Sequence, residues 1–184
     1  MKTIKQISIL LLIALFFSCG DEADRVPDAD LNKANSIEIT LNGQKIQQKY
    51  NADDEIISVY VKDMASDQMV ISAASDADLG VQFDLLIIAK EGSKTIPLIE
   101  RFESEDGFEE ASMTLTVKNG ATSKQYRSVS GSSTLQNLKF TAIPGTALAG
   151  GLASFKYTFS GIFQETGTEE TISISGTLEI NMSF

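Results

Sequence analysis

The chain has no histidine, no tryptophan and a single cysteine among its 184 residues. Without histidine, a Ser-His-Asp triad, a Cys-His pair and a histidine-ligated metal centre are all excluded. One cysteine cannot close a disulfide within the chain. The sequence also lacks a Gly-x-Ser-x-Gly nucleophile elbow and a glycine-rich phosphate loop. We therefore expect a protein without a cofactor or metal that is not an enzyme, with carboxylate chemistry as the remaining catalytic alternative.

Basic residues are also scarce. The chain has 15 Lys and Arg against 25 Asp and Glu, a net charge of −10. Without Lys2 and Lys5 of the N-terminal segment, 13 bases face 25 acids, a net charge of −12. This acidic balance argues against nucleic acid as a partner. It also disfavours electrostatic docking on anionic lipid, so membrane attachment would require a lipid anchor.

No hydrophobic run is long enough to cross a bilayer as a helix. The run from Ile7 to Phe17 contains eleven residues and is interrupted by Ser8, whereas a spanning helix needs about 20. Lys2 and Lys5 precede the run. A basic start followed by a short apolar run is typical of an export signal, which we predict over residues 1–18.

The end of this segment, Phe16-Phe17-Ser18-Cys19-Gly20, resembles the lipobox of bacterial lipoproteins. The resemblance implies cleavage between Ser18 and Cys19 and attachment of acyl chains such as palmitate through the Cys19 thiol. Several acyl chains would make membrane attachment stable. An ordinary secretory signal with an incidental cysteine is the alternative.

Residues 19–35 are acidic, polar and interrupted by Pro27. This composition predicts a disordered tether. The tether is either a plain spacer or a sorting signal, because acidic runs after a lipidated cysteine resemble tags that direct lipoproteins to the outer face of the outer membrane. Gly20 rather than aspartate follows the cysteine, so retention at the inner membrane is not suggested. We therefore expect anchoring to the outer membrane, with exposure at the cell surface as one arrangement.

Alternation of apolar and polar residues dominates the remaining chain, residues 36–184. One parity near the C-terminus is apolar from Ile172 to Phe184, with Gly176 as the expected place for a bulge or bend. In the segment Val81 to Ile88 one parity is apolar throughout, and Leu86 and Ile88 fill the second face, which predicts a central strand covered on both faces. Asn-Gly pairs at 42–43 and 119–120 predict hairpin turns. Further strands are expected over 37–41, 44–50, 57–61, 69–73, 113–117, 124–130, 133–140 and 155–163.

These features predict one all-β domain, an antiparallel β-sandwich or β-barrel of about 8 to 10 strands. The layout resembles small bacterial surface lipoproteins whose domain is all-β, lipocalin-like or a sandwich. The resemblance depends on the lipobox, on Ile39-Thr40-Leu41-Asn42-Gly43, on Phe159-Ser160-Gly161 and on Ile174-Ser175-Gly176-Thr177. The resemblance implies a lipid anchor and an all-β fold. It implies no known active site.

Candidate binding residues are few. Four aromatic residues at strand spacing would either form ordinary core or line a cavity for a small apolar ligand: Phe155, Tyr157, Phe159 and Phe163. The acidic stretch Arg101 to Glu110 is either a solvated loop or a loop that binds a partner or cation. Asp76-Ala77-Asp78-Leu79-Gly80 loosely resembles the start of a calcium loop, although a plain hairpin turn is favoured.

The sequence thus supports three hypotheses about function. The first is a non-enzymatic, lipid-anchored protein that binds a glycan, a small apolar ligand or an envelope protein. The second is a carboxylate-dependent hydrolase acting on surface polysaccharide, which needs two facing carboxylates. The third is a purely structural envelope protein.

Overall fold

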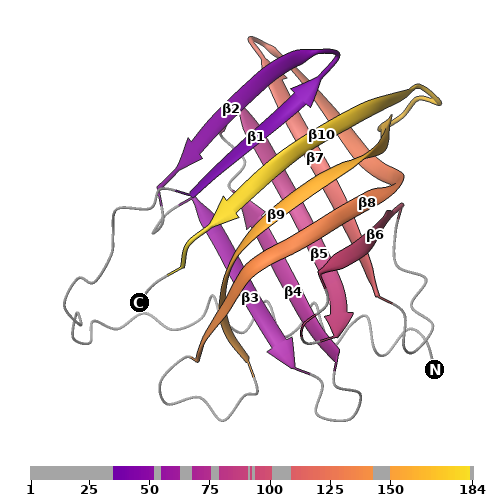
Figure 1. Cartoon of the computed structure of the whole chain (residues 1–184). Helices are drawn as coiled ribbons and strands as arrows, with labels where there is room; N and C mark the ends of the chain where they lie inside the picture. Colours follow the sequence, from indigo (N-terminus) through magenta and orange to yellow (C-terminus); the bar gives the residue numbers. More distant parts are fainter. Residues whose placement is uncertain are drawn as a thin grey trace. The chain divides into compact units, whose positions relative to one another are not determined.

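The computed structural model describes residues 35–51, 55–62, 68–75, 79–90, 92, 94–100, 109–142 and 150–182. All of these residues belong to one compact unit. The predicted export signal and Cys19 lie outside the described residues. The described part contains ten strands (Figure 1): β1 (Asn35–Leu41), β2 (Gln44–Tyr50), β3 (Ile56–Lys62), β4 (Gln68–Ser75), β5 (Val81–Lys90), β6 (Thr95–Ile99), β7 (Glu110–Asn119), β8 (Thr122–Ala142), β9 (Gly150–Glu165) and β10 (Thr171–Ile180).

Six of these strands close a ring. β3 pairs with β4, β4 with β5, β5 with β7, β7 with β8, β8 with β9, and β9 returns to β3, all antiparallel. β10, β1 and β2 continue outward from β9. The short strand β6 runs along β8. The predicted all-β, antiparallel architecture is confirmed as a ten-stranded, barrel-like sandwich.

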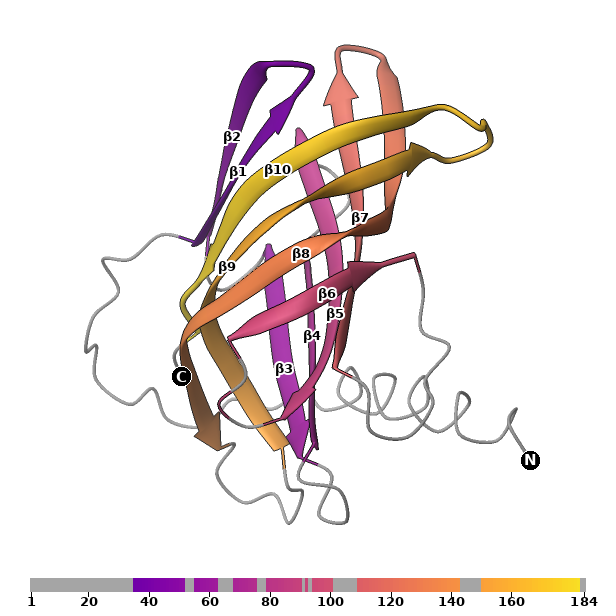
Figure 2. The same ribbon diagram turned by 45° about the vertical axis from the view of Figure 1, so that its right-hand side comes forward.

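Two layers enclose the core. β2, β1, β10, β9 and β8 form the first layer, which crosses in front of β3, β4, β5 and β7, the second layer (Figures 1 and 2). Alternate residues of each strand face the other layer, as in β9, where Ala153, Phe155, Tyr157 and Phe159 are all buried. The alternation in the sequence therefore corresponds to inward and outward faces.

The strand β8 is longer than the sequence predicts. Its Ser-Gly-Ser segment suggests a break between two strands, yet β8 runs through 21 residues, with register shifts between Ser128 and Ser130 and between Gln136 and Lys139. Gly131 lies directly opposite Gly161 of β9. A Cβ on Gly161 would come within 2.4 Å of the Ser130 carbonyl oxygen. The glycines therefore allow two strands to approach closely instead of ending one.

Gly176 has a similar role. The expected bulge is absent, because β10 pairs with β1 and β9 without a register shift at this position. A Cβ here would lie 2.9 Å from Cζ of Phe159 and 2.4 Å from the Glu38 carbonyl oxygen. The missing side chain makes room for the phenyl ring of Phe159 within the core.

The turns and the central strand follow the sequence more closely. Asn42-Gly43 is the turn between β1 and β2, with positive φ at both residues. Asn119 ends β7 and pairs with Thr122, so the second turn is Gly120-Ala121, one residue beyond the predicted pair, with positive φ at Gly120. β5 is central, between β4 and β7. Its second face is only half-buried at Leu86 and Ile88, so this face is less covered than the apolar pattern predicts.

Candidate functional site

The four aromatic residues proposed from the sequence lie in the packed core. Phe155, Tyr157, Phe159 and Phe163 are at most 3% exposed. The ring centroids of Tyr157 and Phe159 are 6.0 Å apart, as are those of Phe159 and Phe163. None of the four lines either of the two hollows described below. A ligand-binding role for these residues stays a prediction.

The phenol of Tyr157 is the polar exception in this aromatic row. Its hydroxyl is buried and has no hydrogen-bond partner. Burial raises the pKa of Tyr157, and the neighbouring Ser133 hydroxyl opposes that rise. Ser133 itself donates a hydrogen bond to the Ile96 carbonyl at 2.9 Å. We therefore assign Ser133 to structural support of β6.

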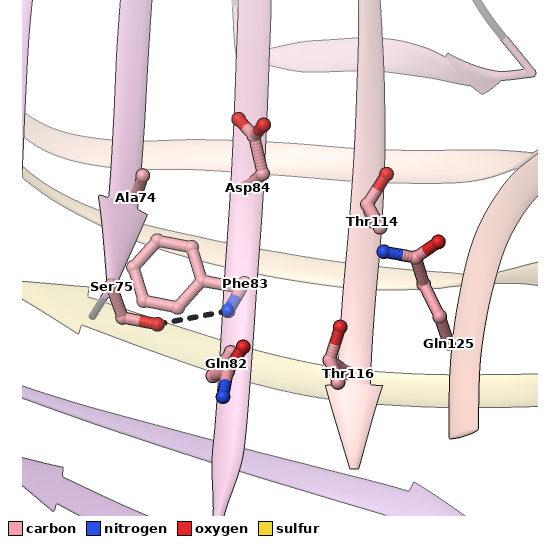
Figure 3. Close-up of a pocket in the computed structure, with 8 residues that line it drawn as sticks. All are labelled: Ala74, Ser75, Gln82, Phe83, Asp84, Thr114, Thr116 and Gln125. Atoms are coloured by element: carbon pink, nitrogen blue, oxygen red, sulfur yellow. Dashed lines mark hydrogen bonds between the residues drawn. The ribbon is translucent and has the colours of Figure 1, made fainter. Parts of the chain in front are cut away.

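A polar hollow lies on the outer side of the second layer, over β4, β5, β7 and β8. Its volume is about 340 Å³, near the lower end of the range for small-molecule pockets. It is lined by Ala74, Ser75, Gln82, Phe83, Asp84, Thr114, Thr116 and Gln125. Figure 3 shows Asp84 on β5 beside the two threonines of β7, with Gln125 on β8 beyond them. We call this feature the polar hollow.

Strand register explains why these polar side chains meet. Asp84 is directly opposite Thr114, and Gln82 is opposite Thr116. Thr116 is in turn opposite Gln125. Because facing residues on adjacent strands have Cβ atoms about 5 Å apart, their side chains form a continuous set of donors and acceptors.

Asp84 is the carboxylate of the polar hollow. Burial raises the pKa of this carboxyl above its usual value of 3.8, and no nearby charge contributes. The residue is nevertheless exposed along part of its surface, so the shift reflects crowding by neighbours and not full burial. Its oxygens are suited to accept hydrogen bonds from an incoming ligand.

The floor of the hollow is attached to the core. The Ser75 hydroxyl accepts a hydrogen bond from the Phe83 backbone N–H at 2.9 Å (Figure 3). The Phe83 ring meets that of Tyr50 edge-on at 5.8 Å. Tyr50 donates to the Val81 carbonyl at 2.9 Å, and burial raises the pKa of its phenol, an effect that the Ser75 hydroxyl opposes. These contacts hold β2 against the start of β5.

The far rim is held by contacts between β8 and the turn after β9. The Thr166 hydroxyl donates to Oε1 of Gln125 at 3.1 Å, which orients the carboxamide. Lys124 forms an ion pair with Glu165 at 2.8 Å. Because Oε1 of Gln125 accepts the hydrogen bond from Thr166, the amide nitrogen of the same side chain is directed toward β7 (Figure 3). There it can donate a hydrogen bond to a ligand.

The polar hollow contains one carboxylate among its lining residues. Glycoside hydrolysis uses two carboxyl groups about 5 to 10 Å apart. The hollow therefore gives the hydrolase hypothesis no support. Its mixture of hydroxyls, carboxamides and a carboxylate is instead suited to multiple hydrogen bonds with a polar molecule.

A second hollow lies on the first layer, beside the turn between β1 and β2, and has a volume of about 500 Å³. It is lined by Thr40, Asn42, Gly43, Ser160, Thr171, Ile172, Ser173, Ile174 and Ser175. Its lining residues supply hydroxyls and the Asn42 carboxamide but no carboxylate. We therefore regard the polar hollow as the candidate site.

Sequence reasoning did not identify Gln82, Asp84, Thr114, Thr116 or Gln125. Each lies on the polar parity of a predicted strand. A two-residue turn at Asn119-Gly120 would place Ser123 opposite Thr116, whereas Asn119 pairs with Thr122 and Gln125 therefore faces Thr116. The missing information is that β5 pairs with β7, which periodicity does not encode.

Other proposed residues lie outside the described part of the chain. These are Ser18, Cys19, Asp76 to Asp78 and most of the acidic stretch, residues 101–108. Among the residues that the structure describes, no cluster of three or more acidic or cysteine side chains could hold a metal ion. In the same residues, no helix has the length and hydropathy needed to cross a membrane.

Fold and site together define an all-β sandwich with a polar hollow on one outer face. No protein-family model, no curated protein and no solved structure matches the chain. The geometry of the site therefore carries the functional interpretation.

Proposed function

We propose that the protein is a lipid-anchored outer-membrane protein that binds a polyhydroxylated ligand of the glycan class in the polar hollow. One observation carries the choice of ligand: two carboxamides, two threonines and the Asp84 carboxylate line one hollow. Sugar hydroxyls both donate and accept hydrogen bonds, so they match this mixture. The proposed activity is binding without chemistry.

The lipid anchor is supported by the N-terminal sequence. A basic start, a short apolar run and a Ser-Cys pair precede a domain whose first described strand begins at Asn35. Attachment through acyl chains on Cys19 would hold the acidic domain at a membrane without electrostatic attraction. Mass spectrometry of the mature N-terminus tests this part directly: an unmodified Cys19 would refute it.

The ligand class is tested by glycan-array binding of the mature chain carrying Cys19→Ser, which removes the acylation site. Asp84→Asn should weaken binding about tenfold or more, since a hydrogen bond to a charged group contributes about 1.5 to 3 kcal/mol. Glu179→Gln on the outer face of β10 is the matched control and should bind as the parent does. Absence of glycan binding, or equal effects of both variants, would refute the proposal.

A further inference from the structure

The second layer has an apolar outer side next to the polar hollow. We call it the apolar face, and it consists of Ile57, Val59, Val61, Val70, Leu86 and Ile88. Val61, Val70 and Ile88 are consecutive cross-strand neighbours. Ile57 is 50% exposed and Val61 is 39% exposed, and the other four are half-buried. Ser72 lies between Val59 and Leu86 in the neighbouring row, so the surface is mainly but not entirely apolar.

The outer side of the first layer is different. There, cross-strand neighbours are hydroxyl residues, with Ser132, Ser160 and Ser175 in one row and Thr134, Thr158 and Thr177 in the next. A polar outer face is normal for an antiparallel sheet that packs on one side only. The apolar face departs from this rule, and contiguous exposed apolar surface usually marks an interaction site.

Charge on the side of the apolar face is balanced. The strands that carry it or adjoin it present Lys90 and Arg127 on this side, against Asp84 and Glu110. Burial raises the pKa of both acids. Among the residues that the structure describes, this side therefore lacks the acidic excess of the whole chain, and these residues present no electrostatic barrier to lipid headgroups.

The length of the tether makes a membrane accessible to this face. Residues 20–34 separate Cys19 from β1, and a chain of that length reaches about 50 Å when extended. The longest strand of the second layer has ten residues, or about 33 Å. The tether therefore permits any face of the domain to turn toward the bilayer, and the anchor keeps the local lipid concentration high.

From these observations we infer that the apolar face rests on the lipid surface to which the N-terminal anchor ties the chain. The inference depends on the lipid anchor proposed above. The aliphatic side chains enter the boundary between headgroups and acyl chains, and the polar outer side of the first layer faces away from the bilayer. The polar hollow shares the row of Ile57 through Ala74, so it opens toward the headgroups, where its ligand would be a glycan of the membrane itself. The affinity of the face alone is weak, and anchoring converts it into a preferred orientation.

Vesicle binding tests the inference. The mature chain with Cys19→Ser is mixed with neutral phosphatidylcholine vesicles at millimolar lipid and sedimented. The double variant Ile57→Glu, Val61→Glu should lower the bound fraction about tenfold, because two aliphatic contacts become charged. Ile162→Glu is the matched control: Ile162 is 37% exposed on β9, in the other layer, and this change should alter binding less than about twofold.

Far-UV circular dichroism establishes that each variant is folded. If the parent chain does not bind vesicles, or if both variants lose binding equally, the inference is overturned. A dimer that dissociates in the double variant, with no vesicle binding by the parent, would assign the face to a second copy instead. Because the vesicle assay uses an unacylated chain, its result is separate from the test of the anchor: an unmodified native Cys19 combined with vesicle binding would refute the anchor alone.

Discussion

Two buried serines should respond in opposite directions to the same substitution. Ser58 on β3 and Ser128 on β8 are both 0% exposed. The Ser58 hydroxyl has no hydrogen-bond partner. The Ser128 hydroxyl donates to the Ile99 carbonyl at 2.5 Å and accepts from the Met113 N–H at 3.0 Å. Ser128 thereby joins β8 to β7 and to the end of β6 at the first register shift.

Ser128→Ala leaves a buried N–H and a carbonyl without their partner, and each such group costs about 1 to 3 kcal/mol. We expect a loss of about 3 kcal/mol in the free energy of unfolding, or roughly 9 °C in Tm for a domain of this size. Ser58→Ala removes an unpaired buried hydroxyl and should stabilise the fold by about 1 kcal/mol. Exposed Ser132→Ala, the control, should change stability by less than about 0.5 kcal/mol.

Urea unfolding measures these differences, with far-UV circular dichroism as the signal because the chain has no tryptophan. Equal m-values among the variants would show that the midpoints report stability alone. A loss of about 1 kcal/mol or more in Ser58→Ala would refute the reasoning, since it would mean that the hydroxyl makes a favourable buried interaction.

Further predictions concern the buried Glu110, the two glycines Gly176 and Gly120, and the Phe159 ring. Burial raises the pKa of Glu110 above its ordinary 4.5, so the folded chain binds this proton more tightly than the unfolded chain and stability falls as pH rises through that range. Glu110→Gln should therefore raise the urea midpoint at pH 7 and have little effect at about pH 3, and an equal gain at both values would contradict the assignment. Gly176→Ala should cost about 2 kcal/mol or more, because the new Cβ meets the Glu38 carbonyl oxygen and the Phe159 ring. Gly120→Ala, with open space around it but φ of +62°, should cost only about 1 to 2 kcal/mol in thermal unfolding, and a larger cost than that of Gly176→Ala would refute the packing argument. Phe159→Ala should cost about 3 to 5 kcal/mol in the same assay, and a loss under about 1 kcal/mol would contradict its place in a tightly packed core.

The sequence predicts most of the strands because burial alternates with period two. The inward residues of β9 and β10 follow the predicted parity, the turn at Asn42-Gly43 lies where expected, and the second turn lies one residue beyond its predicted pair. The strand β6 was not predicted. It has five residues and contains Pro97, so it is too short to show alternation, and proline lowers the strand signal.

The polar hollow could not be predicted, since it depends on pairings between strands that are distant in sequence. Asp84 and Thr114 are 30 positions apart, and their contact follows from the pairing of β5 with β7, which bypasses β6. The polar parity of a strand indicates only that a residue points outward. It does not indicate which outward residues become neighbours.

The pairing of β1 with β10 has a consequence for how the domain assembles. Asn35 at the start of β1 accepts a hydrogen bond from the Asn181 backbone, just after β10, and the two strands pair over six residues. During synthesis, β1 and β2 emerge before the other strands but cannot join the sheet until 130 further residues, from the end of β2 at Tyr50 to the end of β10 at Ile180, have followed. Ile37 and Ile39 therefore stay without their final neighbours until elongation is almost complete. A ribosome-bound chain truncated before β10 should be sensitive to proteolysis in β1, and protection should appear only when β10 has been released.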